Sequence, residues 1–200
     1  GIMNTDPDLK IIEFEEKPEK PKNNMASMGV YVFTWEVVKK YLEEDDKNPN
    51  SSNDFGKNII PSMLDGGERL YAYPFEGYWK DVGTIDSLWE ANMDLLDPKV
   101  TLDLKDIYSR NPMMPPHYVS NEASIQNSLV ADGCNVYGSL EFSILFAGVT
   151  IGKNATINSS IIMPGAVIED GADVQFAIIA ENTVAVSYTH LRAHETCADL

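Results

Sequence analysis

A hexad repeat covers the C-terminal part of the chain and restricts its fold more than any other feature. An aliphatic residue is followed four positions later by a small residue and six positions later by the next aliphatic residue. Such spacing places the aliphatic side chains inside a triangular solenoid of short parallel strands, with the small residues at its corners. The sequence therefore predicts a left-handed parallel β-helix over residues 118–185. The matching hexads are Val119-Ala123-Ile125, Val130-Cys134-Val136, Ile151-Ala155-Ile157, Ile162-Ala166-Ile168 and Ile168-Ala172-Val174.

Hexad solenoids often belong to acyltransferases, which need a general base, usually a histidine, between the coils. The histidines of this chain are His117, His190 and His194, and all of them lie outside the hexads. Cys134 occupies a small corner position, where a cysteine acts as a buried apolar residue. A hexapeptide acyltransferase is therefore a disfavoured alternative, which a scan for acyl-CoA binding would test. We expect the β-helix to serve subunit packing or regulation.

A first candidate site lies near the start of the chain. The apolar run of residues 11–14 predicts a strand, and a proline stops it directly after Glu16 and Lys17. Ser27 then precedes residues 28–33, an apolar and aromatic run that predicts a strand buried on both faces. Lysine supplies a mobile cation for phosphate, while glutamate and serine can bond to hydroxyl groups. These three residues could jointly hold a small phosphorylated ligand. The alternative, which is more common for an adjacent glutamate and lysine, is that Glu16 and Lys17 are solvated surface residues.

The region between the two features predicts alternating helices and strands. Apolar periodicity indicates helices over residues 35–42, 54–64 and 85–96, and a threonine suited to N-capping precedes the first and the last. A proline late in the second helix is expected to bend it. Alternating aromatic residues indicate a strand over residues 69–75.

A second candidate site is the segment Gly77-Tyr78-Trp79-Lys80-Asp81-Val82-Gly83-Thr84, which leads into the last helix. Asp81 lies on a turn just before the helix N-terminus, next to a glycine that lets backbone approach a ligand. A carboxylate there could hold Mg²⁺, which favours oxygen ligands and bridges to substrate phosphates. The alternative is that Asp81 only braces the turn.

Charge and composition exclude two classes of partner. The formal net charge is −16, so the chain should repel nucleic-acid backbones and anionic membranes. We find no run long enough to span a bilayer and no signal-peptide pattern at the start. The two cysteines form neither a disulfide framework nor a metal-binding pattern. The simplest interpretation is a reduced cytoplasmic protein.

The two ends and the middle of the chain differ from these regions. Residues 98–117 form a proline-rich linker. Residues 186–200 carry neither hexads nor periodicity, and the run SYTHLRAHET resembles a translated adaptor, so we expect a non-native tail. Because the chain opens at Gly1 inside a strand-loop pattern, we also expect it to be a fragment.

Taken in order, FEEKP, ASMGVYVF, DFGKNIIP, GYWKDVGT and LWEANMDLL, followed by a β-helix, resemble the bacterial ADP-glucose pyrophosphorylase (glucose-1-phosphate adenylyltransferase) family. The resemblance covers residues 1–185 and is greatest for catalytic subunits. It implies an α/β fold, in which residues 1–97 are the C-terminal half of a Rossmann-like nucleotidyltransferase domain and residues 118–185 the left-handed parallel β-helix. It also implies conversion of ATP and glucose 1-phosphate to ADP-glucose and pyrophosphate, in glycogen biosynthesis.

The resemblance assigns roles to five residues. Lys17 would contact the phosphate of glucose 1-phosphate, Glu16 and Ser27 its sugar hydroxyls, and Trp79 would lie beside the sugar. Asp81 matches one of two aspartates that hold Mg²⁺. The glycine-rich nucleotide loop and the other aspartate are absent, so we expect the remaining catalytic residues in a missing N-terminal half and no activity from this chain alone. A homo- or hetero-tetramer and a small-molecule allosteric effector are also implied.

Two alternatives keep the same resemblance. One is a non-catalytic regulatory subunit of the same assembly, against which the joint presence of Glu16, Lys17, Ser27 and Asp81 argues. The other is a related sugar nucleotidyltransferase for a different base or sugar, a choice that the missing nucleotide loop would decide.

Overall fold

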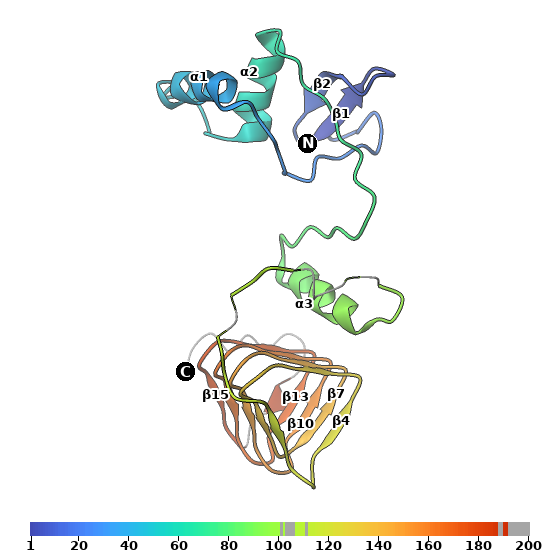
Figure 1. Ribbon diagram of the computed structural model, residues 1–200, viewed down its shortest axis with the longest axis vertical. Helices are drawn as coiled ribbons and strands as arrows, with labels where there is room; N and C mark the ends of the chain where they lie inside the picture. Colours follow the sequence, from blue (N-terminus) through green and yellow to red (C-terminus); the bar gives the residue numbers. More distant parts are fainter. Residues whose placement is uncertain (101, 103–106, 111, 188–189, 192–200) are drawn as a thin grey trace. The chain divides into compact units, whose positions relative to one another are not determined.

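The computed structural model describes residues 1–100, 102, 107–110, 112–187 and 190–191. The chain forms two compact units, Gly1–Gly77 and Tyr78–Leu200, and each has a hydrophobic core of its own (Figure 1). The predicted helix of residues 85–96 belongs by its contacts to the same unit as the β-helix.

The first unit opens with a two-stranded hairpin. β1 (Ile2–Thr5) pairs antiparallel with β2 (Ile11–Glu15), which confirms a strand directly before Glu16 and Lys17. Lys17 has a φ of +48°, a left-handed backbone conformation that a regular strand does not contain. The chain therefore turns away at Lys17 and leaves its side chain beyond the end of the strand.

The helices of the first unit differ in detail from the prediction. α1 (Trp35–Asp46) is longer than expected, and Thr34 precedes it without a capping side-chain bond. The predicted second helix is a π-helical turn, η1 (Phe55–Ile59), continued by α2 (Ile60–Asp65). Its proline lies in the first turn of α2, directly after the π-helical turn, and the expected bend stays a prediction. The shared core is made by Val38, Tyr41, Ile59 and Met63.

Two strands predicted in the first unit are wrong. Residues 28–33 contain no strand, and Val30 and Val32 are 76% and 97% exposed instead of buried. Residues 69–75 make a single antiparallel bridge to the loop before β2. An apolar run becomes a buried strand only where neighbouring strands pair with it. The described part of this unit supplies one two-stranded sheet, which leaves residues 28–33 unpaired and residues 69–75 with only that bridge.

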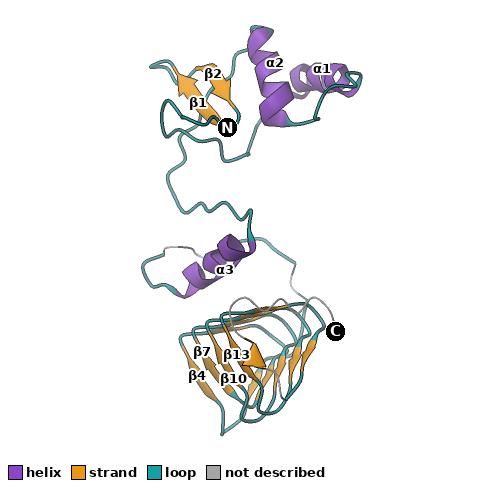
Figure 2. Ribbon diagram, turned by 180° about the vertical axis from the view of Figure 1, so that it is seen from behind, coloured by secondary structure: helices purple, strands orange, loops and turns teal. Residues whose placement is uncertain are grey.

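The second unit is dominated by a parallel β-helix whose coils stack along one axis (Figures 1 and 2). Its three sides are parallel sheets in the orders β16-β13-β10-β7-β4, β14-β11-β8-β5 and β15-β12-β9-β6-β3, which confirms the predicted parallel solenoid. The strands are β3 (Tyr118–Val119), β4 (Ser124–Gln126), β5 (Leu129–Val130), β6 (Asn135–Val136), β7 (Ser139–Glu141), β8 (Ile144–Leu145), β9 (Thr150–Ile151), β10 (Thr156–Asn158), β11 (Ile161–Ile162), β12 (Val167–Ile168), β13 (Asp173–Gln175), β14 (Ile178–Ile179), β15 (Val184–Ala185) and β16 (His190–Leu191).

The interior of the β-helix is filled by the hexad residues, as the spacing predicts. Ile151 and Ile168 are fully buried, and they are direct register partners on adjacent coils. Leu145, Ile162 and Ile179 form an equivalent column on another side. Because each aliphatic side chain contacts the one above and the one below, the core is continuous through the coils.

Cys134 fills a corner of this core, also as predicted. Its side chain is 1% exposed, and its Sγ atom lies 3.1 Å from the carbonyl oxygen of Phe146. Burial raises the pKa of the thiol, which disfavours the reactive thiolate. The residue therefore has a packing role.

A ladder of serine hydroxyls runs through one corner of the β-helix and was not predicted. The hydroxyls of Ser128, Ser143 and Ser160 each accept a backbone N–H of the next coil at 3.1 Å. Each hydroxyl also donates to the carbonyl two residues earlier in its own coil, at 2.7–2.8 Å. The ladder satisfies backbone groups that the sharp corner would otherwise leave unpaired. It ends at Ala177, whose side chain has no hydroxyl.

Helix α3 (Ile85–Met93) and the 3₁₀ turn η2 (Asp94–Leu96) pack against this corner. The indole N–H of Trp89 donates to the carbonyl oxygen of Ser159 at 2.8 Å, and its ring lies 6.1 Å from that of Phe176. Met93 and Ile161 are buried in the same cluster. The corner itself is a column of residues with left-handed backbone: Asn127, Phe142, Ser159 and Phe176.

Replacing Trp89 by Phe should lower the free energy needed to open α3 away from the β-helix by about 0.5–1.5 kcal/mol, because the carbonyl of Ser159 loses its hydrogen-bond donor. Amide hydrogen exchange in α3 under rising urea measures the change. Trp35→Phe is the matched control, since Trp35 is 62% exposed on α1. Equal effects of the two substitutions on exchange in α3 would contradict the inferred contact.

The last part of the chain is described only in part. β16 lies beyond residue 185, where the hexads end, and its backbone pairs with β13. Most of the predicted non-native tail, including His194 and Cys197, lies outside the described residues. Among the described helices, none has the length and apolarity needed to cross a bilayer.

Candidate functional site

Glu16 and Ser27 lie together at the end of the hairpin in the first unit. The Glu16 carboxylate lies against the backbone of Gly1, and the carbonyl of Gly1 accepts the N–H of Ser27 at 2.8 Å. A Cβ at Gly56 would lie 2.5 Å from the Glu16 carboxylate, so a side chain at this position would displace that carboxylate. Glycine at this position therefore lets the carboxylate approach the start of η1.

An aromatic group borders Ser27, and the sequence analysis did not assign it to the site. The hydroxyls of Ser27 and Tyr31 are 3.3 Å apart. The rings of Tyr31, Phe33 and Phe55 form a three-membered cluster, with Tyr31 and Phe55 stacked at 5.6 Å and Phe33 at 5.8 Å from each of them. An aromatic face beside paired hydroxyls is well suited to a sugar ring, and the aromatic residues of ASMGVYVF and DFGKNIIP were the available signal.

Lys17 leaves its ammonium group available to a ligand. It forms no hydrogen bond or ion pair with the described residues, although its charge acts on Asp54. The pKa of Asp54 is held below its ordinary value mainly by the N–H of Lys57, which donates to Oδ1 at 2.8 Å, and to a smaller extent by the Lys17 charge. Asp54 caps η1 in this way and stays ionised close to Lys17.

Trp79 and Asp81 lie at the start of the second unit. Trp79 is 45% exposed, and the exposed carboxylate of Asp81 forms no hydrogen bond or ion pair with another described residue. Thr84 caps α3 as predicted, in a reciprocal capping box with Ser87. No group of three acidic, histidine or cysteine side chains in the described ranges is arranged to hold a metal ion. The metal role of Asp81 therefore stays a prediction.

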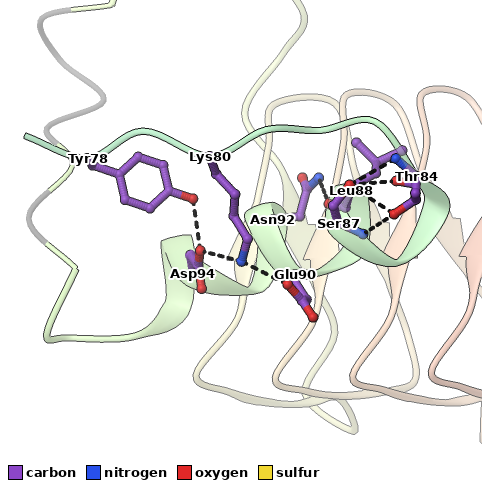
Figure 3. A network of polar contacts seen from close by, with 8 residues as sticks. All are labelled: Tyr78, Lys80, Thr84, Ser87, Leu88, Glu90, Asn92 and Asp94. Carbon is purple, nitrogen blue, oxygen red and sulfur yellow. Dashed lines mark hydrogen bonds and ion pairs between the residues drawn. The ribbon is translucent and has the colours of Figure 1, made fainter. Parts of the chain in front are cut away.

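Between Trp79 and Asp81, Lys80 is held by two carboxylates of α3 and η2 (Figure 3). Its hydrogen bond with Asp94 is the main cause that raises the pKa of Lys80 and, in turn, lowers the pKa of Asp94. Tyr78 also donates to Asp94, and burial is the main cause that raises the pKa of its phenol. The sequence analysis placed no role on Lys80.

The predicted site residues thus fall into two groups. Glu16, Lys17 and Ser27 belong to the first compact unit, and Trp79 and Asp81 to the second. Convergence of Lys17 and Asp81 on one sugar phosphate therefore stays a prediction.

Comparison with known proteins connects both groups to one family. The family model for nucleotidyl transferases matches residues 1–98, and the model for the GlmU-like C-terminal hexapeptide region matches residues 115–191. A glucose-1-phosphate adenylyltransferase of Desulforamulus reducens is 54% identical over 199 residues, which cover 98% of this chain and 50% of that protein. The chain belongs to the glucose-1-phosphate adenylyltransferase family.

Other members of this family show the same relation. Proteins of that name from Bacillus cereus and Bacillus anthracis are each 48% identical over 204 residues, covering the whole of this chain and 54% of their own length. The chain therefore spans about half the length of the curated relatives it matches. The match confirms the family resemblance and the order of a nucleotidyltransferase region followed by hexapeptide coils.

Proposed function

We propose that this chain is the part of a glucose-1-phosphate adenylyltransferase that binds glucose 1-phosphate and supplies one ligand of a divalent metal. The observation that carries the proposal is the ammonium of Lys17, which has no hydrogen bond or ion pair with the described residues and follows Glu16 directly, with Glu16 and Ser27 both lying against Gly1, in a chain of this family. In the reaction, a phosphate oxygen of glucose 1-phosphate attacks the α-phosphorus of ATP. Pyrophosphate leaves, and ADP-glucose forms.

Each residue has a separate role in this proposal. Lys17 neutralises the sugar phosphate, because a lysine acts as a mobile point charge for phosphate oxygens. Glu16 and Ser27 accept hydrogen bonds from sugar hydroxyls, with Tyr31 extending the same polar edge. Trp79 covers the sugar with an apolar face. Holding the attacking oxygen in place supplies much of the catalysis in such a transfer.

The metal is proposed to be Mg²⁺, held by Asp81. This exposed carboxylate has the hard oxygen that Mg²⁺ prefers, and Mg²⁺ takes few protein ligands when phosphates complete its shell. Bound there, the ion neutralises charge on the phosphates. The other metal ligand and the ATP loop are proposed to lie in the half of the enzyme that this chain does not contain, upstream of Gly1.

The wider setting is proposed on the same basis. The enzyme would serve glycogen biosynthesis in the cytoplasm as a homo- or hetero-tetramer that binds a small-molecule effector, with the β-helix in subunit packing. This chain alone is proposed to release no pyrophosphate from ATP and glucose 1-phosphate, since it lacks the ATP half of the site.

Calorimetric titration of the chain with glucose 1-phosphate tests the substrate role. Lys17→Gln should weaken binding about ten- to a hundredfold, because a charge-assisted hydrogen bond contributes roughly 1.5–3 kcal/mol. Lys20→Gln is the matched control, since Lys20 is an exposed lysine three residues away. Unchanged binding in the Lys17 variant would favour the regulatory-subunit alternative over a substrate site.

A further inference from the structure

A three-residue contact joins the Trp79–Asp81 segment to the end of α3. The Lys80 Nζ atom lies 3.0 Å from Oδ2 of Asp94 and 3.1 Å from Oε2 of Glu90. The Tyr78 hydroxyl donates to the same Oδ2 atom at 2.8 Å. Figure 3 shows the side chains of Tyr78 and Lys80 both extending toward Asp94 from the segment that passes over the helix. We call Tyr78, Lys80 and Asp94 the clasp.

The clasp engages a helix that is itself fixed at its start and at its middle. Thr84 and Ser87 form a capping box at its start, and Trp89 bonds to the β-helix corner at Ser159. The side chains of Lys80 and Asp94 are 26% and 30% exposed, so their ion pair is partly shielded from water. Glu90 is 56% exposed, and such exposed pairs contribute little. The pair with Asp94 is therefore the stronger attachment.

Trp79 and Asp81, the neighbours of Lys80 on either side, have no comparable anchor. Asp81 has no hydrogen-bond partner among the described residues, and Trp79 is 45% exposed. The segment has no assigned helix or strand from Tyr78 to Gly83, so regular backbone pairing does not fix it. The clasp is thus the main set of described side-chain contacts that holds this short segment.

We propose that Lys80 is a positioning residue, which fixes the backbone of residues 79–81 so that Asp81 presents its carboxylate to the metal. The proposal rests on the metal role of Asp81 given above. Lys80 need not contact substrate, because its ammonium is occupied by Asp94. Lys80 acts by keeping residues 79–81 in one conformation. A small displacement of the Asp81 side chain would weaken the metal site.

Backbone ¹⁵N order parameters of the 200-residue chain test the clasp without any catalysis. Lys80→Met keeps the aliphatic stem and removes the charge, and it should lower the order parameters at residues 79–82 from near the rigid value of about 0.85 to below about 0.6. Lys80→Arg, which keeps the charge, should restore the high values. Lys153→Met, at an exposed lysine of the β-helix, is the matched control and should change nothing there. Unchanged order parameters in Lys80→Met would overturn the proposal.

The metal arm uses a full-length enzyme in which this chain is joined to the upstream half of the Desulforamulus reducens relative (the completed enzyme), once its activity is verified. Lys80→Met should raise the Mg²⁺ concentration for half-maximal rate about tenfold, as happens when a residue that orients a metal ligand is lost, with Lys80→Arg close to the unchanged chain. If Asp81→Asn alters this concentration and Lys80→Met does not, the positioning role is wrong. If Asp81→Asn leaves the Mg²⁺ dependence unaltered, the metal role of Asp81 fails, and the proposal built on it falls as well, while the order parameters still report the clasp.

Discussion

Replacing Asp81 by Asn in the completed enzyme is expected to lower kcat about a hundred- to a thousandfold, the range seen when one transition-state contact is removed. An amide oxygen carries no net charge, so it is a much weaker ligand for Mg²⁺ than a carboxylate. Raising the Mg²⁺ concentration should recover part of the rate, whereas raising glucose 1-phosphate should not. The measurement is pyrophosphate release at saturating substrates over a range of Mg²⁺ concentrations.

Asp86→Asn is the control for this substitution. Asp86 lies in the first turn of α3, five positions along the chain, and carries the same charge. It should cost only the modest interaction of an acidic residue with a helix N-terminus, about 0.3–1 kcal/mol of stability, and leave the Mg²⁺ dependence unchanged. If both variants lose activity equally, net charge explains the loss and Asp81 is not a metal ligand.

Replacing Ile162 by Ala should lower the free energy of unfolding of the β-helix by about 2–5 kcal/mol, the range for truncation of a large buried side chain. Ile162 is fully buried and stands between Leu145 and Ile179 on the neighbouring coils. The cavity would remove contacts on both sides of β11, and closely stacked coils have little room to collapse around it. Amide exchange in β8, β11 and β14 under denaturant reports this unit alone.

Val184→Ala is the matched control for the core. Val184 is also a branched residue in a β-helix strand, but it is 53% exposed. Its truncation should change stability by at most about 0.5 kcal/mol. A comparable loss in the two variants would mean that the hexad positions do not define the core.

The β-helix was predictable because its signal is repeated and local. Ile151 and Ile157 are six residues apart, as are Ile162 and Ile168, and a repeat of this kind fixes which side chains face inward without knowledge of any distant contact. Capping by Thr84 was predictable for the same reason, since a cap acts within four residues.

The features that sequence reasoning missed depend on partners far along the chain. Trp89 was assigned correctly to a helix face, but its partner Ser159 is 70 residues away and is recognised through a backbone carbonyl. The serine ladder was not predicted, because serine is common in turns, where its hydroxyl bonds to nearby backbone. The strand expected at residues 28–33 failed for the opposite reason, since its apolarity says nothing about whether a neighbouring strand is present.

For the candidate site, the position of several residues along the chain was predictable from the sequence, but their tertiary contacts were not. The position of Glu16 and Lys17 after β2 followed from an apolar run ended by a proline. The stacking of Tyr31 on Phe55 joins two motifs 24 positions apart through a tertiary contact, which neither motif encodes by itself. Lys80 was overlooked because a lone lysine between two site residues has no pattern of its own.

The serine ladder makes two layers of the β-helix interchangeable. From Ser143 to Ser160 the chain advances 17 residues and from Ser160 to Ala177 another 17, whereas the layer from Ser128 to Ser143 has 15. Excising residues 144–160 would place Ile161 where Ile144 stands, with the same bond types above and below. The β-helix could thus be shortened or lengthened by whole layers. Its length along the axis, and with it the area of each side that can contact other molecules, would change without a change in the rest of the fold.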